Sequence, residues 1–247
     1  MSEISIEVKD VTKTFRIYHE KRNSVFEALV GWFNKKKYYE DLQILQNINF
    51  TIKKGEMFGI IGRNGAGKTT LLRIISGIYK PDTGTVRVNG LLIPLLGLGI
   101  GFQLDLTAKT NVVQYGILLG FKKKQILERV DQIMEFAELE KFADTKLKNF
   151  SSGMYSRLAF STAVQVDPDI LILDEILYAG DLSFQQKAFD AIISFKKRGK
   201  SILLVTHDMR PVQDQCDRAM FLNNGKSELV GTPRDVIEAY TKSLHLK

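Results

Sequence analysis

Uninterrupted apolar runs of four or five residues recur along the chain. The clearest are Met57–Ile61, Ile170–Leu173 and Ile202–Val205. Such a run is typical of a strand in a parallel sheet that is covered on both faces, since neither set of side chains meets water. These three segments therefore predict the centre of a parallel sheet.

Shorter apolar or alternating segments predict further strands at residues 4–8, 49–52, 85–88, 218–222 and 226–230. Asn89-Gly90 predicts a hairpin turn after the third of these, and Asn223-Asn224-Gly225 predicts a hairpin between the last two. Glycines alternate with apolar residues between Leu95 and Gly101, which predicts a loop.

Helical spacing dominates the rest of the chain. From residue 107 to 165 the pattern is helical, with one apolar face formed by Ile126, Val130, Ile133, Met134 and Ala137. Residues 183–198 predict a helix that ends at Gly199, and Thr232-Pro233 predicts the start of a last helix. Strands that alternate with helices in this way predict an α/β fold.

Residues 24–34 form a separate amphipathic segment, with apolar residues at Val25, Phe26, Leu29, Val30, Trp32 and Phe33. Lysines and an arginine lie on both sides of it. A short aromatic helix with basic ends suits a membrane interface or a docking partner. It equally suits packing on its own domain, and the pattern alone leaves both interpretations open.

Composition narrows the class of protein. The 247 residues carry a net charge of +7, which permits contact with nucleic acid, anionic lipid or nucleotide. Most of the lysine clusters, such as residues 122–124, are expected to lie on solvated surfaces.

The single cysteine, Cys216, excludes an internal disulfide and suits a reducing compartment. No apolar run approaches 18 residues and no signal peptide is apparent, so we expect any membrane span to come from another chain.

The chemistry centres on the segment that follows the first buried strand: Gly62-Arg63-Asn64-Gly65-Ala66-Gly67-Lys68-Thr69. It fits the phosphate-binding P-loop, in which backbone N–H groups surround phosphate oxygens. Lys68 would reach the β- and γ-phosphates, the Thr69 hydroxyl would hold Mg²⁺, and Thr70 completes the predicted ATP site. The predicted helix that follows would place the phosphates at its N-terminus.

Three more polar residues follow buried strands. Asp174 and Glu175 come directly after residues 170–173, and His207 follows the strand at 202–205. Because carboxyl ends of parallel strands share one sheet edge, all three are predicted beside the P-loop. Asp174 would help hold Mg²⁺, Glu175 would activate the attacking water, and His207 would contact the γ-phosphate or the water.

Ser151-Ser152-Gly153-Met154 precedes an apolar helical run. Small hydroxyl residues in this position are typical of an ordinary helix cap. The same helix start is also a candidate anion site, because its N–H groups lack partners within the helix.

Together these motifs resemble the nucleotide-binding subunit of ABC transporters, in order and spacing from residue 4 to about residue 240. The resemblance identifies Phe150–Met154 as the signature segment, Ile170–Glu175 as the Walker B motif and Ala179-Gly180-Asp181 as the D-loop, with His207 as the switch histidine. It implies an α/β fold with a RecA-like P-loop NTPase core, an antiparallel β-subdomain and a helical signature subdomain.

The resemblance also implies further site residues. Ser151, Ser152, Gly153 and Asp181 would contact nucleotide. Gln103 would be the Q-loop glutamine and a metal contact, although its loop is shorter than in most ABC proteins. Phe15, or alternatively Tyr18, would stack on the adenine, and a core role is the other interpretation of Phe15.

Departures from the usual signature indicate a subgroup. Ser152 replaces a glycine and Met154 a glutamine. This signature, the D-loop region and the glycine-alternating stretch resemble the ATPases that export bacterial O-antigen and teichoic acid. Residues 18–42 resemble their insertion, whose helix lies near the membrane interface. A C-terminal carbohydrate-binding domain, found in some members, is expected to be absent because the sequence ends at Lys247.

The resemblance divides one ABC ATPase domain into 1–105 with the insertion, a helical subdomain at 106–165, the rest of the core at 166–231 and a last helix at 232–247. It implies a homodimer at the cytoplasmic face of the inner membrane, which binds ATP and Mg²⁺ and acts with an integral-membrane permease on lipid-linked polysaccharide.

Two rival functions remain. An import ATPase is disfavoured by the signature and the insertion. A nucleic-acid-associated ABC ATPase is disfavoured because the chain has room for neither a long coiled coil nor a second ATPase unit, so we expect no nucleic-acid partner.

Overall fold

The computed structural model describes residues 3–18, 39–95, 97–174 and 182–245. A six-stranded sheet forms the centre, in the order β5 (Leu92–Pro94), β6 (Ile170–Leu173), β7 (Ser201–Thr206), β3 (Met57–Ile61), β8 (Arg218–Asn223) and β9 (Lys226–Gly231). The strands run parallel except β9, which pairs antiparallel with β8. The three predicted central strands are therefore confirmed, as are their parallel directions.

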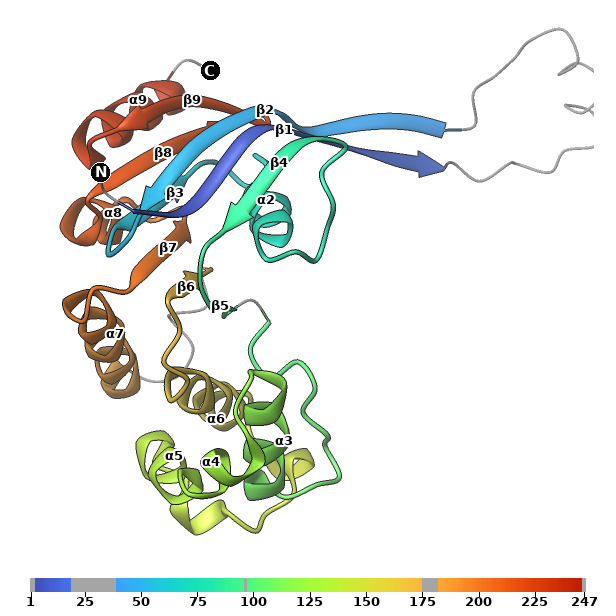
Figure 1. Cartoon of the computed structure of the whole chain (residues 1–247), viewed down its shortest axis with the longest axis vertical. Coiled ribbons are helices and arrows are strands. Elements are labelled where there is room, and N and C mark those ends of the chain that lie inside the picture. Colours follow the sequence, from blue (N-terminus) through green and yellow to red (C-terminus); the bar gives the residue numbers. More distant parts are fainter. Residues whose placement is uncertain (1–2, 19–38, 96, 175–181, 246–247) are drawn as a thin grey trace, which may run out of the picture.

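A second sheet covers one face of the first (Figure 1). It contains β2 (Tyr39–Lys53), β1 (Ile4–Tyr18) and β4 (Thr83–Val88), all antiparallel. The helix α2 (Lys68–Ile75) packs on the same face, where its Leu71 and Leu72 join the core between the two sheets.

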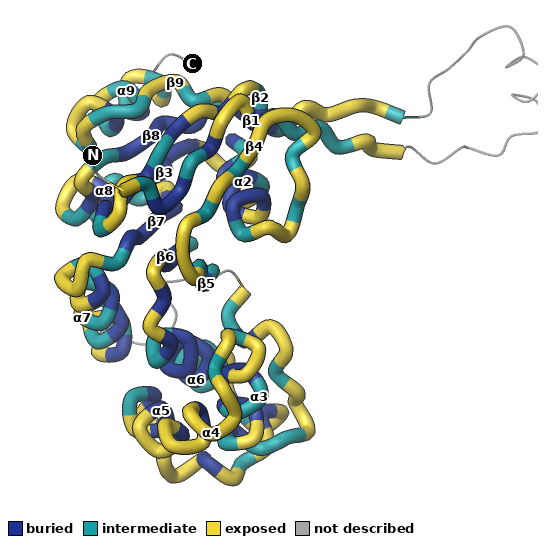
Figure 2. The backbone as a smooth tube through the Cα atoms, in the orientation of Figure 1, coloured by how far each residue is buried: buried dark blue, intermediate teal, exposed yellow. Residues whose placement is uncertain are grey.

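Three helices cover the other face of the six-stranded sheet: α7 (Leu182–Lys197), α8 (Met209–Gln215) and α9 (Pro233–His245). The core on this side takes Phe184 and Phe195 from α7, Val212 from α8 and Tyr240 from α9. Alternate residues of the central strands enter opposite cores, so their inner residues are apolar, and the polar Ser201 and Thr206 stand at the two ends of β7. Figure 2 shows the central strands buried.

The remaining helices form a separate group beside the sheet (Figure 1). They are α3 (Ala108–Leu118), α4 (Lys123–Leu127), α5 (Val130–Ala137) and α6 (Ser152–Val164), with short 3₁₀ turns at Glu140–Phe142 and Leu147–Asn149. The predicted apolar face is buried in a core of its own. Among the described residues, no helix has the length and hydropathy needed to span a membrane.

Two features of the first 105 residues differ from expectation. Asn89-Gly90 is not a hairpin turn: β4 pairs with β1 in one sheet, while β5 pairs with β6 in the other. The backbone N–H and side chain of Asn89 instead bond to the carbonyls of Ser5 and Ile4. In addition, β1 and β2 are 15 residues each, so Tyr18 and Tyr39–Leu42, assigned to the insertion, lie in strands.

Cys216 packs beside Val212 and is only 9% exposed. Burial is the largest influence on its thiol and raises the pKa to about 12, while the charge of Lys196 acts in the opposite direction. The thiol is therefore neutral and poorly reactive at physiological pH.

Candidate functional site

The predicted P-loop connects β3 to α2 at the carboxyl edge of the central sheet. Gly67 is the N-cap of α2 and has a left-handed backbone with φ 102°. Among the described residues no side chain caps this helix, and its first turn contains no acidic residue. Such a helix start suits phosphate binding, because the first N–H groups of a helix have no acceptor within the helix.

Close packing explains two of the loop's glycines. A Cβ on Gly62 would lie 2.2 Å from the Leu222 carbonyl oxygen, which cannot move without disturbing β8. A Cβ on Gly67 would lie 2.9 Å from the Leu45 side chain, at a φ that other residues rarely adopt. The loop is thus held against both sheets by contacts that only glycine permits.

Lys68 is buried, with 7% of its surface exposed. Its Nζ donates to the carbonyl oxygen of Gly62 at 2.7 Å and to that of Arg63 at 3.2 Å. The ammonium group therefore closes the loop from inside and lies where the motif requires it for contact with phosphate.

A cavity of about 570 Å³ opens over this loop. Its lining residues are Ile44, Asn64, Gly65, Gly67, Lys68, Thr69, Thr70 and Asp174. The Thr69 hydroxyl and the Asp174 carboxylate supply oxygen ligands, which Mg²⁺ prefers. One hydroxyl and one carboxylate suit a cation that takes its other ligands from phosphate and water.

His207 directly follows β7, the strand between β6 and β3. It is exposed at the same sheet edge as Asp174, although it does not line the cavity. The turn around it is fixed, because Asp208 N–H donates to Thr206 Oγ1 at 2.9 Å and Asp208 caps α8. The structure thus brings the P-loop, Asp174 and His207 to one edge, as the sequence predicts.

The signature segment lies elsewhere, at the start of α6. Ser151 is the N-cap, and its hydroxyl accepts a hydrogen bond from Met154 N–H at 3.2 Å. Ser151 and Ser152 are exposed and do not line the P-loop cavity. Both sequence interpretations fit this geometry, because a capped helix start with exposed hydroxyls can also face an anion.

The other candidate residues do not line the cavity either. Phe15 is half-buried, and its ring packs edge-on against Tyr79 at 5.6 Å between centroids. Tyr18 is 74% exposed near Tyr39, at the far end of β1. Gln103 is exposed in the loop between β5 and α3. Their roles in binding adenine and metal stay predictions.

Some predicted features lie outside the described residues. These are Glu175, the D-loop with Asp181, and the segment 24–34. The structure also adds a residue that was not predicted: Ile44 of β2 lines the cavity. Nothing in the sequence marks it, because a strand isoleucine is ordinary and its place depends on contact between the two sheets.

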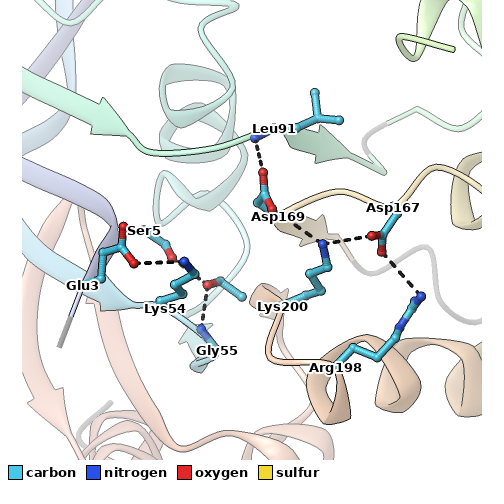
Figure 3. A network of polar contacts seen from close by, with 10 residues as sticks. Glu3, Ser5, Lys54, Gly55, Leu91, Asp167, Asp169, Arg198 and Lys200 are labelled. Atoms are coloured by element: carbon cyan, nitrogen blue, oxygen red, sulfur yellow. Dashed lines mark hydrogen bonds and ion pairs between the residues drawn. The ribbon is translucent and has the colours of Figure 1, made fainter. Parts of the chain in front are cut away.

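A second cavity of about 560 Å³ lies at the opposite, amino edge of the sheet. Lys54, Arg198 and Lys200 line it together with Glu3 and Asp169. Figure 3 shows these charges pointing toward one another. Lys54 pairs with Glu3 at 2.9 Å, and Lys200 lies 3.6 Å from Asp169. This edge therefore neutralises its cations within the chain and is a poor phosphate site.

The family model of the ABC transporter matches residues 45–177, which extend from β2 past the P-loop, the signature segment and Asp174. The chain belongs to the ABC transporter family. It carries the ATPase cassette of that family, with the antiparallel sheet, the P-loop core and the helical group that the resemblance implies.

Several relatives of this ABC transporter chain are named as ATP-binding proteins of export systems. It is 42% identical to the O-antigen export system ATP-binding protein RfbB of Myxococcus xanthus, over 98% of this chain and 56% of that protein. It is 38% identical to RfbB of Klebsiella pneumoniae, over 97% of this chain and 98% of that protein. It is also 38% identical to the teichoic acids export ATP-binding protein TagH of Lactococcus lactis, over 98% of this chain and 51% of that protein. The chain thus spans about half the length of two of these relatives.

A solved ABC cassette has the same fold. A dimeric ATP-binding cassette in a post-hydrolysis state, bound to ADP and Pi, superimposes with a TM-score of 0.72 at 25% identity. The match covers 93% of this chain and 99% of that one.

Proposed function

We propose that this ABC transporter chain is the ATP-hydrolysing subunit that powers export of a lipid-linked surface polysaccharide of the O-antigen or teichoic acid type. The observation that carries the proposal is the 38–42% identity to two O-antigen export proteins over 97–98% of this chain. The similarity to a teichoic acid export protein widens the substrate class to surface polymers on lipid carriers.

The P-loop edge supplies the machinery for ATP hydrolysis. The first N–H groups of α2 and Lys68 hold the phosphates. Thr69 and Asp174 would hold Mg²⁺, which would supply positive charge beside the phosphates. Glu175, one residue beyond Asp174, takes a proton from the attacking water. His207 orients that water or the γ-phosphate, and Gln103 contacts the metal site. Positioning and charge stabilisation then do most of the catalysis.

A second copy of the chain is expected to complete the site, with two ATP molecules between two head-to-tail copies. Gly153 supports this arrangement. Among the residues that the structure describes, a Cβ there would meet only Ser151 Oγ, at 3.8 Å, so packing against them does not require glycine. Glycine in a helix costs about 1 kcal/mol relative to alanine. The close approach that favours glycine would come from the partner's nucleotide.

The transport path is expected to lie in a separate integral-membrane permease, because the relatives are named as the ATP-binding proteins of export systems. We place the dimer at the cytoplasmic face of the inner membrane, where ATP is available. The relative movement of the helical group and the P-loop core would then drive the permease.

The test is deletion of the gene in its host, followed by analysis of lipid-linked and surface polymer. Export by this chain predicts loss of surface polymer and accumulation of the lipid-linked form inside the cell. Wild-type protein should restore the surface polymer, and Lys68→Ala should not.

Normal surface polymer in the deletion strain would contradict the proposal. Accumulation of an unrelated solute outside the cell would instead indicate an importer. If the ATPase activity of the purified protein responds to nucleic acid and not to the membrane subunit, the protein would instead be a nucleic-acid-associated ABC ATPase.

A further inference from the structure

The loop between β5 and α3 contains three alternating glycines that the ATPase mechanism does not use. Gly97, Gly99 and Gly101 all have positive φ, at 63°, 81° and 97°. A Cβ on Gly99 would lie 2.5 Å from the ring of Tyr155, and one on Gly101 would lie 2.6 Å from Leu118. Side chains from α6 and α3 therefore press directly on this loop.

Tyr155 ties the loop to α6. Its hydroxyl donates to the Gly99 carbonyl oxygen at 2.9 Å, and its ring packs edge-on against Phe102 at 5.1 Å between centroids. Phe102 makes the same contact with Tyr115 of α3, also at 5.1 Å. Tyr155 directly follows the signature segment, and its backbone N–H donates to the carbonyl of Ser151, one helical turn earlier, at 3.0 Å. The loop is thus two contacts away from the start of the signature helix.

Asn111 holds the other end of the loop. It is fully buried, and its Oδ1 accepts from Gln103 N–H at 2.6 Å. Its Nδ2 lies at 2.9–3.2 Å from the carbonyl oxygens of Gln103, Leu106 and Thr107. A buried amide with all its polar atoms paired is costly to rearrange. The backbone on both sides of Gln103 is therefore fixed to α3.

We propose that Tyr155 and Asn111 are positioning residues that make Gln103 and the Ser151–Gly153 helix start move as one unit. This rests on the proposed head-to-tail dimer, in which Gln103 belongs to the chain's own ATP site and Ser151 faces the partner's ATP. Capture of the partner's nucleotide would then shift Gln103 in the first site. The loop links the two ATP sites, and ATP hydrolysis is cooperative because of it.

Tyr155→Phe tests the link, because it removes the hydroxyl and keeps the ring against Phe102. Loss of one hydrogen bond corresponds to roughly a five-fold effect. We expect kcat to fall about five-fold, the KM for ATP to change less than two-fold, and the Hill coefficient of wild type to fall toward 1. Tyr240→Phe is the control, since Tyr240 is a buried tyrosine of α9 whose ring packs edge-on against Phe221 of β8.

Asn111→Asp provides a second test. Aspartate can still accept from Gln103 N–H but cannot donate to the three carbonyls, so we expect a larger loss of cooperativity than for Tyr155→Phe. Thermal unfolding of each variant separates a loss of coupling from a loss of fold.

A Tyr155→Phe protein with the kcat and Hill coefficient of Tyr240→Phe would overturn the link and leave ATP-driven export standing. Wild-type hydrolysis without cooperativity, with the membrane subunit present, would also overturn the link alone. A wild-type protein that does not hydrolyse ATP would overturn both proposals.

Discussion

The two edges of the central sheet offer a controlled comparison, because the same three strands end at both. At the carboxyl ends of β3, β6 and β7 lie the P-loop, Asp174 and His207. At their amino ends lie Lys54, Asp169 and Lys200 (Figure 3). Each edge adjoins a cavity of similar size, about 570 and 560 Å³, and each has buried or half-buried lysine nearby.

The difference lies in how each edge uses its polar groups. At the amino edge, Lys200 pairs with Asp167 at 3.1 Å, and the same carboxylate lies 3.4 Å from Arg198. The helix α7 ends at Lys197, next to Arg198 and Gly199 of the cavity lining, and the carboxyl end of a helix favours cations and disfavours anions. At the carboxyl edge a helix begins, and its N–H groups favour anions. Positive residues alone therefore do not make a phosphate site. The direction of the adjoining helix determines whether an edge favours anions.

Replacing Glu175 with glutamine gives the largest expected effect at the carboxyl edge. Glutamine keeps the size of the side chain but cannot accept a proton, and a general base is worth 10²–10⁴-fold. We expect ATP turnover to fall about 10³-fold while ATP binding is retained, as measured by steady-state hydrolysis and a nucleotide-binding titration. Near-normal hydrolysis would contradict the assignment of Glu175 as the base.

Lys68→Ala and Lys200→Ala compare the two edges directly. Lys68→Ala removes the ammonium group that holds the loop and the phosphates, so we expect kcat/KM for ATP to fall about 10²-fold. Lys200→Ala removes a cation whose partners are Asp167 and Asp169, so we expect kcat/KM within two-fold of wild type. Equal losses in the two variants would show that the edges do not differ as described.

Asp169→Asn should have the smallest effect. The carboxylate accepts from Leu91 N–H at 2.9 Å and lies near Lys200, and both interactions lower its pKa, the backbone hydrogen bond most. Asparagine can keep the hydrogen bond, so the exposed site should lose only about 0.5 kcal/mol of unfolding free energy after solvent screening. ATPase activity should not change.

The lowered pKa sets the pH dependence of that small effect. A carboxylate with a depressed folded pKa stabilises the protein above its unfolded pKa, near 3.9, and loses this contribution as the pH falls through the folded value. Denaturant unfolding of wild type and Asp169→Asn should therefore differ at neutral pH and converge in acid. A difference that grows in acid would contradict this role of Asp169.

Local patterns predicted the carboxyl edge well. The buried runs at 57–61 and 170–173 each specify a strand by themselves, and the residues that follow them must lie at the strand ends. The hairpin predicted at Asn89-Gly90 was wrong because turn chemistry does not specify which sheet the next strand joins. That next strand, β5, pairs with β6 in the other sheet. The full length of β1 and β2 was missed because their outer pairs, such as exposed Tyr18 and half-buried Tyr39, gain stability from each other and not from the core.

Contacts between distant segments could not be predicted. Ile44 reaches the nucleotide cavity only because the two sheets pack together. Gly99 needs to be glycine because of Tyr155, 56 residues later, and the sequence shows only a glycine-rich loop. The motifs thus identify the groups that meet phosphate, while the packing that couples them depends on the complete fold.

The buried state of Cys216 makes the protein a convenient subject for distance spectroscopy. With a single thiol whose pKa is about 12, a maleimide or nitroxide reagent should modify only cysteines that are introduced on the surface. Labels at Asn64 and at Ser151 of separate copies would then report how two subunits approach during turnover, with no native cysteine to replace first.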